Sequence, residues 1–198
     1  MKILFIKATP KDETDSYTMK AAHAFLDSYK KVNPAHKITY LDLYRENIQY
    51  LDRELLHDLY NNPQSDILNY ARQFAQADRF IIAAPMWNLG FPAILKAYIE
   101  YISVPGITFS ITAGRPVGLL EGKGKKAVHI TARGGIYSSG PAAEFEMGDR
   151  YLRTLLRFLG IDHFETLEIE GTNHFTGHEL EARIEDALTK AGRMAENF

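Results

Sequence analysis

The stretch Arg79–Asn88, which reads RFIIAAPMWN, decides the fold of this 198-residue chain. Its apolar centre shows no alternation with polar residues, which is the pattern of a strand buried on both faces of a parallel sheet. We therefore predict a strand from Arg79 to Pro85. Pro92 then suits the first turn of a helix, and apolar residues follow it at helical spacing. A buried strand followed by an amphipathic helix is the repeating unit of an open α/β sheet.

Four other short apolar runs predict further strands, separated by segments with apolar residues at helical spacing. These strands are Ile3–Ile6, Ile38–Leu43, Ala127–Thr131 and Phe164–Ile169. The intervening helices are predicted from Ser16 to Asn33, and around residues 51–59, 67–74, 152–159 and 180–188. Prolines and glycines interrupt the pattern at about 104–125, where we expect an excursion that could hold a small hairpin.

Strands that alternate with helices predict a single domain over residues 1–198, with one parallel sheet and helices on both faces. For five strands we expect the flavodoxin-like three-layer sandwich with strand order 2-1-3-4-5. Ligands in such folds bind beyond the carboxyl ends of the strands, at the point where the strand order reverses. The chemistry should therefore lie in the loops after the first, third and fourth strands.

Composition excludes several classes of protein. The chain has 23 basic and 25 acidic residues, a net charge of −2, and no cysteine. Without cysteine there is no disulfide framework and no thiolate nucleophile, and the charge argues against nucleic-acid partners and a polybasic membrane anchor. The apolar run at Ile3–Ile6 is too short for a signal segment or a membrane span. We expect a cytoplasmic protein without a membrane partner.

The loop after the first strand, residues 9–18, is rich in hydroxyl residues and opens a helix. Hydroxyls and free amides at a helix N-terminus form an anion site that suits a phosphate. The loop has neither a Walker A sequence nor the glycines of a dinucleotide fingerprint, which leaves a phosphate-monoester cup. The competing interpretation is that Ser16 only caps the helix, and the acidic residues of this loop weigh mildly against an anion there.

The loop after the third strand places a methionine, the single tryptophan and a phenylalanine within residues 85–92. Such side chains can form a wall for a planar aromatic ligand, with Asn88 at its polar edge. Alternatively, they form a hydrophobic turn that packs on a neighbouring helix.

The loop after the fourth strand contains Arg133-Gly134-Gly135, whose glycines allow close approach to a ligand or mark a turn with positive φ.

Together, Ser16-Tyr17-Thr18, Pro85-Met86-Trp87-Asn88 and the run from Thr131 to Ile136 resemble the FMN-dependent NADH-azoreductases, also described as FMN-dependent NADH:quinone oxidoreductases. The resemblance covers essentially the whole chain. It implies a homodimer with one tightly and non-covalently bound FMN per subunit. The cofactor-binding residues it implies are Thr9, Ser16, Tyr17 and Thr18 for the phosphate, and Pro85, Met86, Trp87, Asn88, Leu89, Ala132, Arg133, Gly134 and Gly135 for the ring.

The resemblance also implies the reaction: NADH or NADPH donates electrons to FMN, which passes them to quinones or azo compounds by a ping-pong mechanism. No side-chain nucleophile is required, and Tyr137, where the family often has histidine, is the ionisable side chain to test as a proton donor. Ala8-Thr9 also replaces two serines common in the family, and the segment 109–111 lacks an aromatic residue often found near the acceptor.

Two other interpretations of the residues compete with this one. A flavodoxin-like FMN electron carrier or regulatory binding protein is the alternative function, although electron carriers are usually strongly acidic, which a net charge of −2 does not match. His174 and His178 are four residues apart but flank Gly177, which suits a surface loop better than a metal-bearing helix. We therefore expect no metal site.

Overall fold

The computed structural model describes the backbone of residues 1–198 and every side chain except that of Glu13. The strands are β1 (Lys2–Lys7), β2 (Lys37–Asp42), β3 (Arg79–Ala83), β4 (Phe109–Thr112), β5 (Arg115–Gly118), β6 (Lys126–Ala132) and β7 (His163–Ile169). The helices are α1 (Tyr17–Val32), α2 (Arg53–Asn61), α3 (Ile67–Gln76), α4 (Ala93–Ile102), α5 (Gly148–Phe158) and α6 (Gly177–Asn197), with short 3₁₀ turns η1 (Glu13–Asp15) and η2 (Pro141–Phe145).

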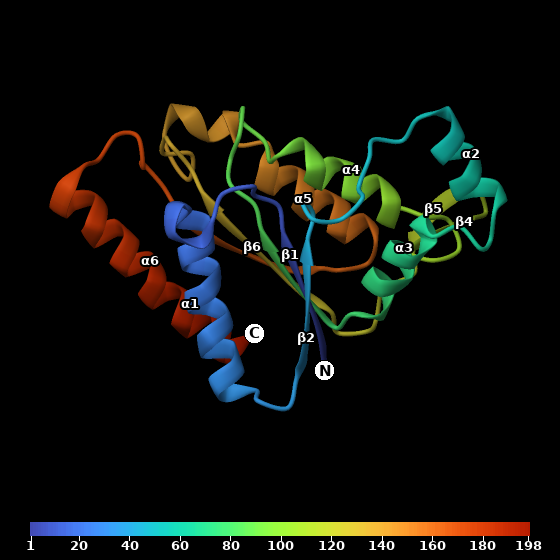
Figure 1. Ribbon diagram of the computed structural model, residues 1–198, viewed down its shortest axis with the longest axis horizontal. Coiled ribbons are helices and arrows are strands. Elements are labelled where there is room, and N and C mark those ends of the chain that lie inside the picture. The colour runs from blue at the N-terminus through green and yellow to red at the C-terminus, as the bar shows by residue number, and fades with distance from the viewer.

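Within the described chain, the main sheet has five parallel strands in the order β2-β1-β3-β6-β7. This confirms the predicted order 2-1-3-4-5 and the flavodoxin-like class. Helices α1 and α6 lie side by side on one face, and α3, α4 and α5 lie on the other (Figure 1). The chain leaves β1 toward β2 on one side and reaches β3 on the other, so the switch point lies between β1 and β3, as expected.

The continuous apolar strands are explained by two cores, one on each face of the sheet. Ile3 and Phe5 of β1 pack with α1 and α6, while Leu4 and Ile6 pack with the helices of the opposite face. Alternate residues of a strand point to opposite faces, so a strand covered on both sides has no position for exposed polar residues. The same pattern places His129 of β6 on the α5 side.

The last helix is longer than its leucine pattern predicts. It runs from Gly177 to Asn197, because its later turns bury small residues against α1 rather than large ones. These residues are Ala187, Ala191 and Ala195, spaced four apart. Phe198 then packs edge-to-face on Phe25. Alanines at this spacing carry little hydrophobic signal in a sequence, although they allow two helices to approach closely.

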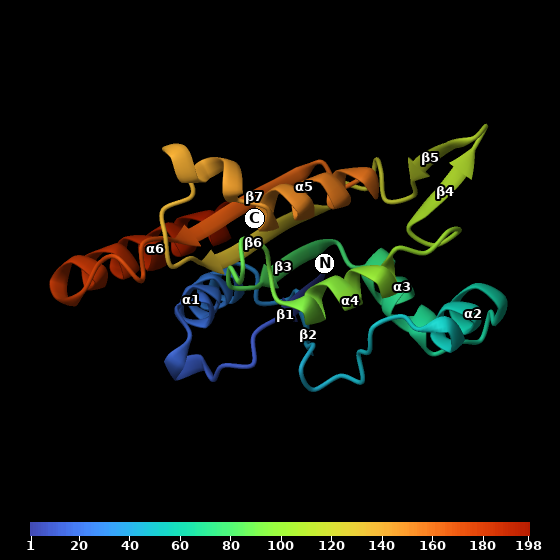
Figure 2. The same ribbon diagram turned by 90° about the horizontal axis from the view of Figure 1, so that it is seen from above.

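The predicted excursion contains an antiparallel hairpin of β4 and β5, which projects from the body of the molecule (Figure 2). Its turn is formed by Ala113 and Gly114, which both have positive φ, the conformation that a two-residue hairpin of this kind requires. Among the described helices, none is long and apolar enough to cross a membrane.

Candidate functional site

Direct hydrogen bonds join the three loops at the carboxyl edge of the sheet. The Ala8 amide donates to the Ala83 carbonyl at 2.9 Å, and the Met86 amide donates to the Ala132 carbonyl at 3.0 Å. The Ala132 amide in turn donates to Thr18 Oγ1 at 3.0 Å. The loops that follow β1, β3 and β6 therefore form one continuous rim, as the strand order predicts.

The β1 loop presents the N-terminus of α1 to this rim. Ser16 caps the helix, because its Oγ accepts the Met19 amide at 3.3 Å, and both Ser16 and Thr18 are buried. The first intrahelical bond runs from the Lys20 amide to the Ser16 carbonyl, so the amides of Tyr17 and Thr18 precede the hydrogen-bonded ladder. The capping interpretation and the anion interpretation of this loop are thus compatible.

The first turn of α1 carries no acidic side chain that would repel an anion. Lys20, in the same turn, lies over the Tyr17 ring, 5.5 Å from its centroid. Asp12 lines a different hollow, between β2 and α1, together with Lys7 and Asp42. Thr9 is fully buried, and its Oγ1 accepts the Lys11 amide at 3.3 Å.

The β3 loop forms a tight turn that exposes apolar side chains. Trp87 and Gly90 exchange two hydrogen bonds, each 3.0 Å long, which close a turn over Asn88 (φ 48°) and Leu89 (φ 68°). The Trp87 side chain is 39% exposed and Leu89 is 40% exposed. A leucine held in the left-handed region costs free energy, and such strain is often found at functional sites. Because Trp87 and Leu89 are partly exposed, the alternative interpretation, a hydrophobic turn that packs on a helix, does not describe them.

The β6 loop is held by a buried arginine. Arg133 is 4% exposed, and its guanidinium pairs with Glu146 at 3.4 Å and with Glu170 at 3.1 Å. Glu170 also accepts the Tyr137 amide at 2.8 Å and the Ser138 hydroxyl, so it fixes the path of the loop. Among the described residues, Arg133 Nε is a buried donor without a hydrogen-bond partner.

The two glycines of this loop serve close packing. Neither Gly134 nor Gly135 has a positive φ, so the interpretation of a turn with positive φ is wrong. A Cβ at Gly134 would lie 2.5 Å from Asn173 Nδ2, and one at Gly135 would lie 2.9 Å from the Tyr137 ring. The loop after β7, which contains Asn173, packs on the β6 loop, and a larger residue at Gly134 would require the Asn173 side chain to move.

Tyr137 and Glu146, which was outside the predicted set of site residues, lie beside these loops. The Tyr137 side chain lines a hollow of about 440 Å³ on the α5 side, together with Asp149 and Arg153, so its role as a proton donor stays a prediction. Glu146 was not predicted, and the signal available in the sequence was an acidic residue just before a helix. Its carboxylate accepts the Asp149 amide at 2.9 Å, at the N-terminus of α5.

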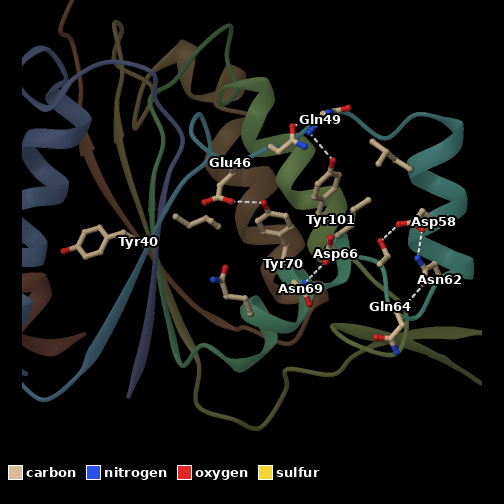
Figure 3. A pocket seen from close by; sticks show the side chains of 16 residues that line it. Tyr40, Glu46, Gln49, Asp58, Asn62, Gln64, Asp66, Asn69, Tyr70 and Tyr101 are labelled. Carbon is tan, nitrogen blue, oxygen red and sulfur yellow. Dashed lines mark hydrogen bonds between the residues drawn. The ribbon is translucent and has the colours of Figure 1, made fainter.

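A larger hollow, of about 730 Å³, lies at the β2 edge of the molecule, between α2 and α3 (Figure 3). It is separate from the three loops. Tyr70 donates to Glu46 at 2.9 Å, and the Gln49 amide donates to the Tyr101 hydroxyl at 3.1 Å, so these tyrosines anchor the loop that follows β2. Burial, together with the Glu46 carboxylate, raises the pKa of Tyr70 to about 12.

Comparison with known proteins places this geometry in a family. Residues 1–194 match a family described as having the flavodoxin-like fold. An FMN-dependent NADH:quinone oxidoreductase from Clostridium perfringens is 50% identical over 202 residues, covering 100% of this chain and 99% of the relative. One from Lachnoclostridium phytofermentans is 47% identical at the same coverage.

Solved structures agree with the sequence relatives. The crystal structure of azoreductase AzrA superposes with a TM-score of 0.91, at 34% identity, and covers 100% of both chains. An FMN-dependent NADH-azoreductase from Bacillus anthracis, solved in complex with FMN, has a TM-score of 0.86 at 29% identity, covering 98% of this chain and 100% of that one. The chain belongs to the flavodoxin-like family of FMN-dependent NADH:quinone oxidoreductases and azoreductases.

Proposed function

We propose that this protein is an FMN-dependent oxidoreductase that passes electrons from NADH or NADPH to quinones and azo compounds. The observation that carries this proposal is the rim itself, in which a helix N-terminus, an exposed aromatic wall and a third loop are joined by hydrogen bonds. The relatives named above have the same fold and are described by the same activity.

The residues present fit FMN. A phosphate monoester suits the amides of Tyr17 and Thr18 with the buried hydroxyls of Thr9, Ser16 and Thr18, because the first turn of α1, residues 17–20, has no acidic side chain to repel it. The exposed side chains of Trp87 and Leu89 suit a planar apolar ring. A cofactor with carbonyl and ring-nitrogen acceptors also suits a buried donor such as Arg133 Nε.

The site residues keep the roles predicted from the resemblance. One side of the ring is lined by Pro85, Met86, Trp87, Asn88 and Leu89, and the segment from Ala132 to Gly135 closes the other side. Because Arg133 already pairs with two carboxylates, its guanidinium contributes mainly by fixing this segment. Asn88 reaches the polar edge of the ring from a turn whose backbone is held on both sides.

Bound FMN supplies the two-electron chemistry, taking a hydride from the nicotinamide and reducing the acceptor. With Trp87, Leu89 and the 132–135 segment around the ring, its solvent-facing side takes one planar substrate at a time. NADH and the quinone or azo compound therefore alternate there in a ping-pong order. Initial rates measured over a grid of both substrates should give parallel double-reciprocal lines, whereas intersecting lines would reject this order.

A homodimer is part of the proposal. Large apolar side chains are exposed beside the β3 loop, and it is unfavourable for all of them to remain in contact with water. They are Trp87, Leu89, Phe145, Met147 and Tyr151. A second copy of the chain covers this surface in our proposal, next to the cofactor loops. Sedimentation equilibrium should give twice the mass of the chain, and a monomer at micromolar concentration would reject the dimer.

The activity test is direct. The purified protein should be yellow or take up added FMN, and it should oxidise NADH rapidly when a quinone or an azo dye is present. A protein that binds FMN but leaves NADH unoxidised would favour the alternative of an FMN electron carrier or regulatory protein. A protein that binds no FMN would reject the proposal. We further propose that the enzyme acts in the cytoplasm, on small acceptors, without a nucleic-acid or membrane partner.

A further inference from the structure

A histidine is buried beneath the cofactor loops with both ring nitrogens in use. His129 of β6 is 2% exposed. Its Nε2 lies 3.2 Å from the carbonyl oxygen of Ala84, and its Nδ1 lies 3.1 Å from Asp149 Oδ1. A carbonyl oxygen only accepts hydrogen bonds, so Nε2 is the donor to Ala84, and Nδ1 lies within hydrogen-bond distance of the Asp149 carboxyl group.

Asp149 is held as a carboxylate by the groups around it. Besides His129, it accepts the Thr166 hydroxyl of β7 at 2.6 Å and Arg153 of α5 at 3.3 Å. Burial would raise the pKa of Asp149, but the hydrogen bond and charge of His129, with Thr166 and Arg153, outweigh burial and lower it. The His129 ring thus contacts Asp149 of α5 and the Ala84 carbonyl after β3, while Arg153 of α5 and Thr166 of β7 contact Asp149.

His129 and Asp149 are each connected to one of the proposed cofactor loops. Ala84 is the first residue after β3 and directly precedes the Pro85–Leu89 loop, so a bond to its carbonyl fixes the direction in which this loop starts. On the other side, the Asp149 amide donates to Glu146, which pairs with Arg133 at 3.4 Å. Buried polar contacts thus run from the start of the β3 loop to the start of the β6 loop.

We propose that His129 is a positioning residue for flavin binding. Through the Ala84 carbonyl it orients the wall formed by Met86–Leu89, and through Asp149 it keeps this wall in register with the Arg133–Gly135 segment. This inference rests on the proposed function, since it assigns His129 to the same site. It differs from a purely structural role in one testable respect: loss of the Nε2 contact with Ala84, at the start of the wall, should weaken cofactor binding more than loss of the Nδ1 contact with Asp149.

Two substitutions separate the ring nitrogens. In His129→Gln, the side-chain amide can occupy the place of Nε2 and still donate to Ala84, while the contact with Asp149 is lost. In His129→Asn, the shorter amide can occupy the place of Nδ1 and donate to Asp149, while Ala84 loses its donor. His163→Gln is the matched control, because His163 is exposed at the start of β7 and pairs only with Glu165 among the described residues.

The readouts are the dissociation constant of FMN, by titration of the apoprotein, and the melting temperature of the apoprotein. We expect His129→Asn to weaken FMN binding about tenfold or more, since the Ala84 carbonyl at the start of the wall loses its hydrogen-bond donor. His129→Gln should keep its FMN dissociation constant within about threefold of the parent, although its melting temperature falls because Asp149 loses the hydrogen bond of the ring. His163→Gln should change neither quantity.

Several outcomes would overturn the proposal. If both substitutions weaken FMN binding equally and in step with the melting temperature, His129 contributes stability alone. If the apoproteins of both variants fail to fold, the parent decides the matter: FMN added to the ¹⁵N-histidine-labelled apoprotein should shift the His129 ring resonances, and unchanged resonances reject the role. A parent that binds no FMN would instead reject the proposed function, so the two failures are distinguishable.

Discussion

Leu89 shows how one strained residue can shape a binding wall. Its φ of 68° lies in the left-handed region, which leucine rarely adopts, yet the turn is held by the Trp87–Gly90 bonds and by the Met147 amide, which donates to the Leu89 carbonyl at 3.0 Å. The surrounding contacts therefore enforce a conformation that the residue itself disfavours. The result is an apolar side chain presented at the rim rather than buried.

The first prediction concerns this strain. Leu89→Gly should leave the free energy of unfolding within about 1 kcal/mol, because relief of strain offsets the greater flexibility of glycine in the unfolded chain. FMN affinity should fall severalfold, because the wall loses a side chain. Urea unfolding and FMN titration measure the two effects. Ala113→Gly is the matched control: it also has positive φ, but it lies in the β4–β5 hairpin, so FMN affinity should not change.

The second prediction concerns the tryptophan beside it. Trp87→Ala should weaken FMN binding by about tenfold, because the loss of an aromatic contact removes roughly 1 kcal/mol or more of stacking and burial. Trp87→Phe should restore most of the affinity, since it keeps an aromatic face. Fluorescence titration with FMN measures both variants. Full flavin retention in Trp87→Ala would show that the ring does not lie against this side chain.

At the scale of elements, the site depends on bonds that join one secondary-structure element to another. Helix α1 is tied to the end of β6 by Thr18, a buried residue whose hydroxyl accepts the Ala132 amide. The same residue lies in the first turn of the helix, where the phosphate is proposed to bind. One side chain thus connects the phosphate end of the site to its ring end.

The third prediction tests this connection. Thr18→Val keeps the shape of the side chain but leaves the Ala132 amide without its acceptor, which should destabilise the protein by about 1–3 kcal/mol. FMN affinity should fall as well, because both ends of the site lose their link. Thr18→Ser is the control, since it retains the hydroxyl. Chemical unfolding of all three apoproteins checks the prediction, and equal stability of the valine and serine variants would contradict it.

At the scale of the whole molecule, the strand order could be predicted because continuous apolar runs such as Phe80–Ala84 report burial on two faces. That the three candidate loops meet at one rim could also be predicted, because the carboxyl ends of parallel strands lie at the same edge of the sheet. The other features of the fold and the site depend on contacts between residues far apart in the sequence, which no local pattern reports. The partners of Arg133 come from residues 13 and 37 positions away, Gly134 of its loop faces Asn173 of another loop, and the end of α6 depends on alanines that show no amphipathic signal.

The stability of the protein in acid should depend on His129 and Asp149, which link β6 to α5 and, through Thr166, to β7. The pKa of Asp149 is lowered below its usual value of 3.8, so the folded protein binds this proton less readily than the unfolded chain. The stabilisation is therefore fully present above the unfolded pKa and is lost as the pH falls through the folded pKa. The difference in unfolding free energy between the parent and Asp149→Asn should be constant above pH ~5 and shrink steadily below pH ~4. Asp162→Asn, at an exposed site, is the control and should show no such trend. A parent–variant difference that stays the same down to acid unfolding would mean that the carboxylate of Asp149 does not stabilise the fold.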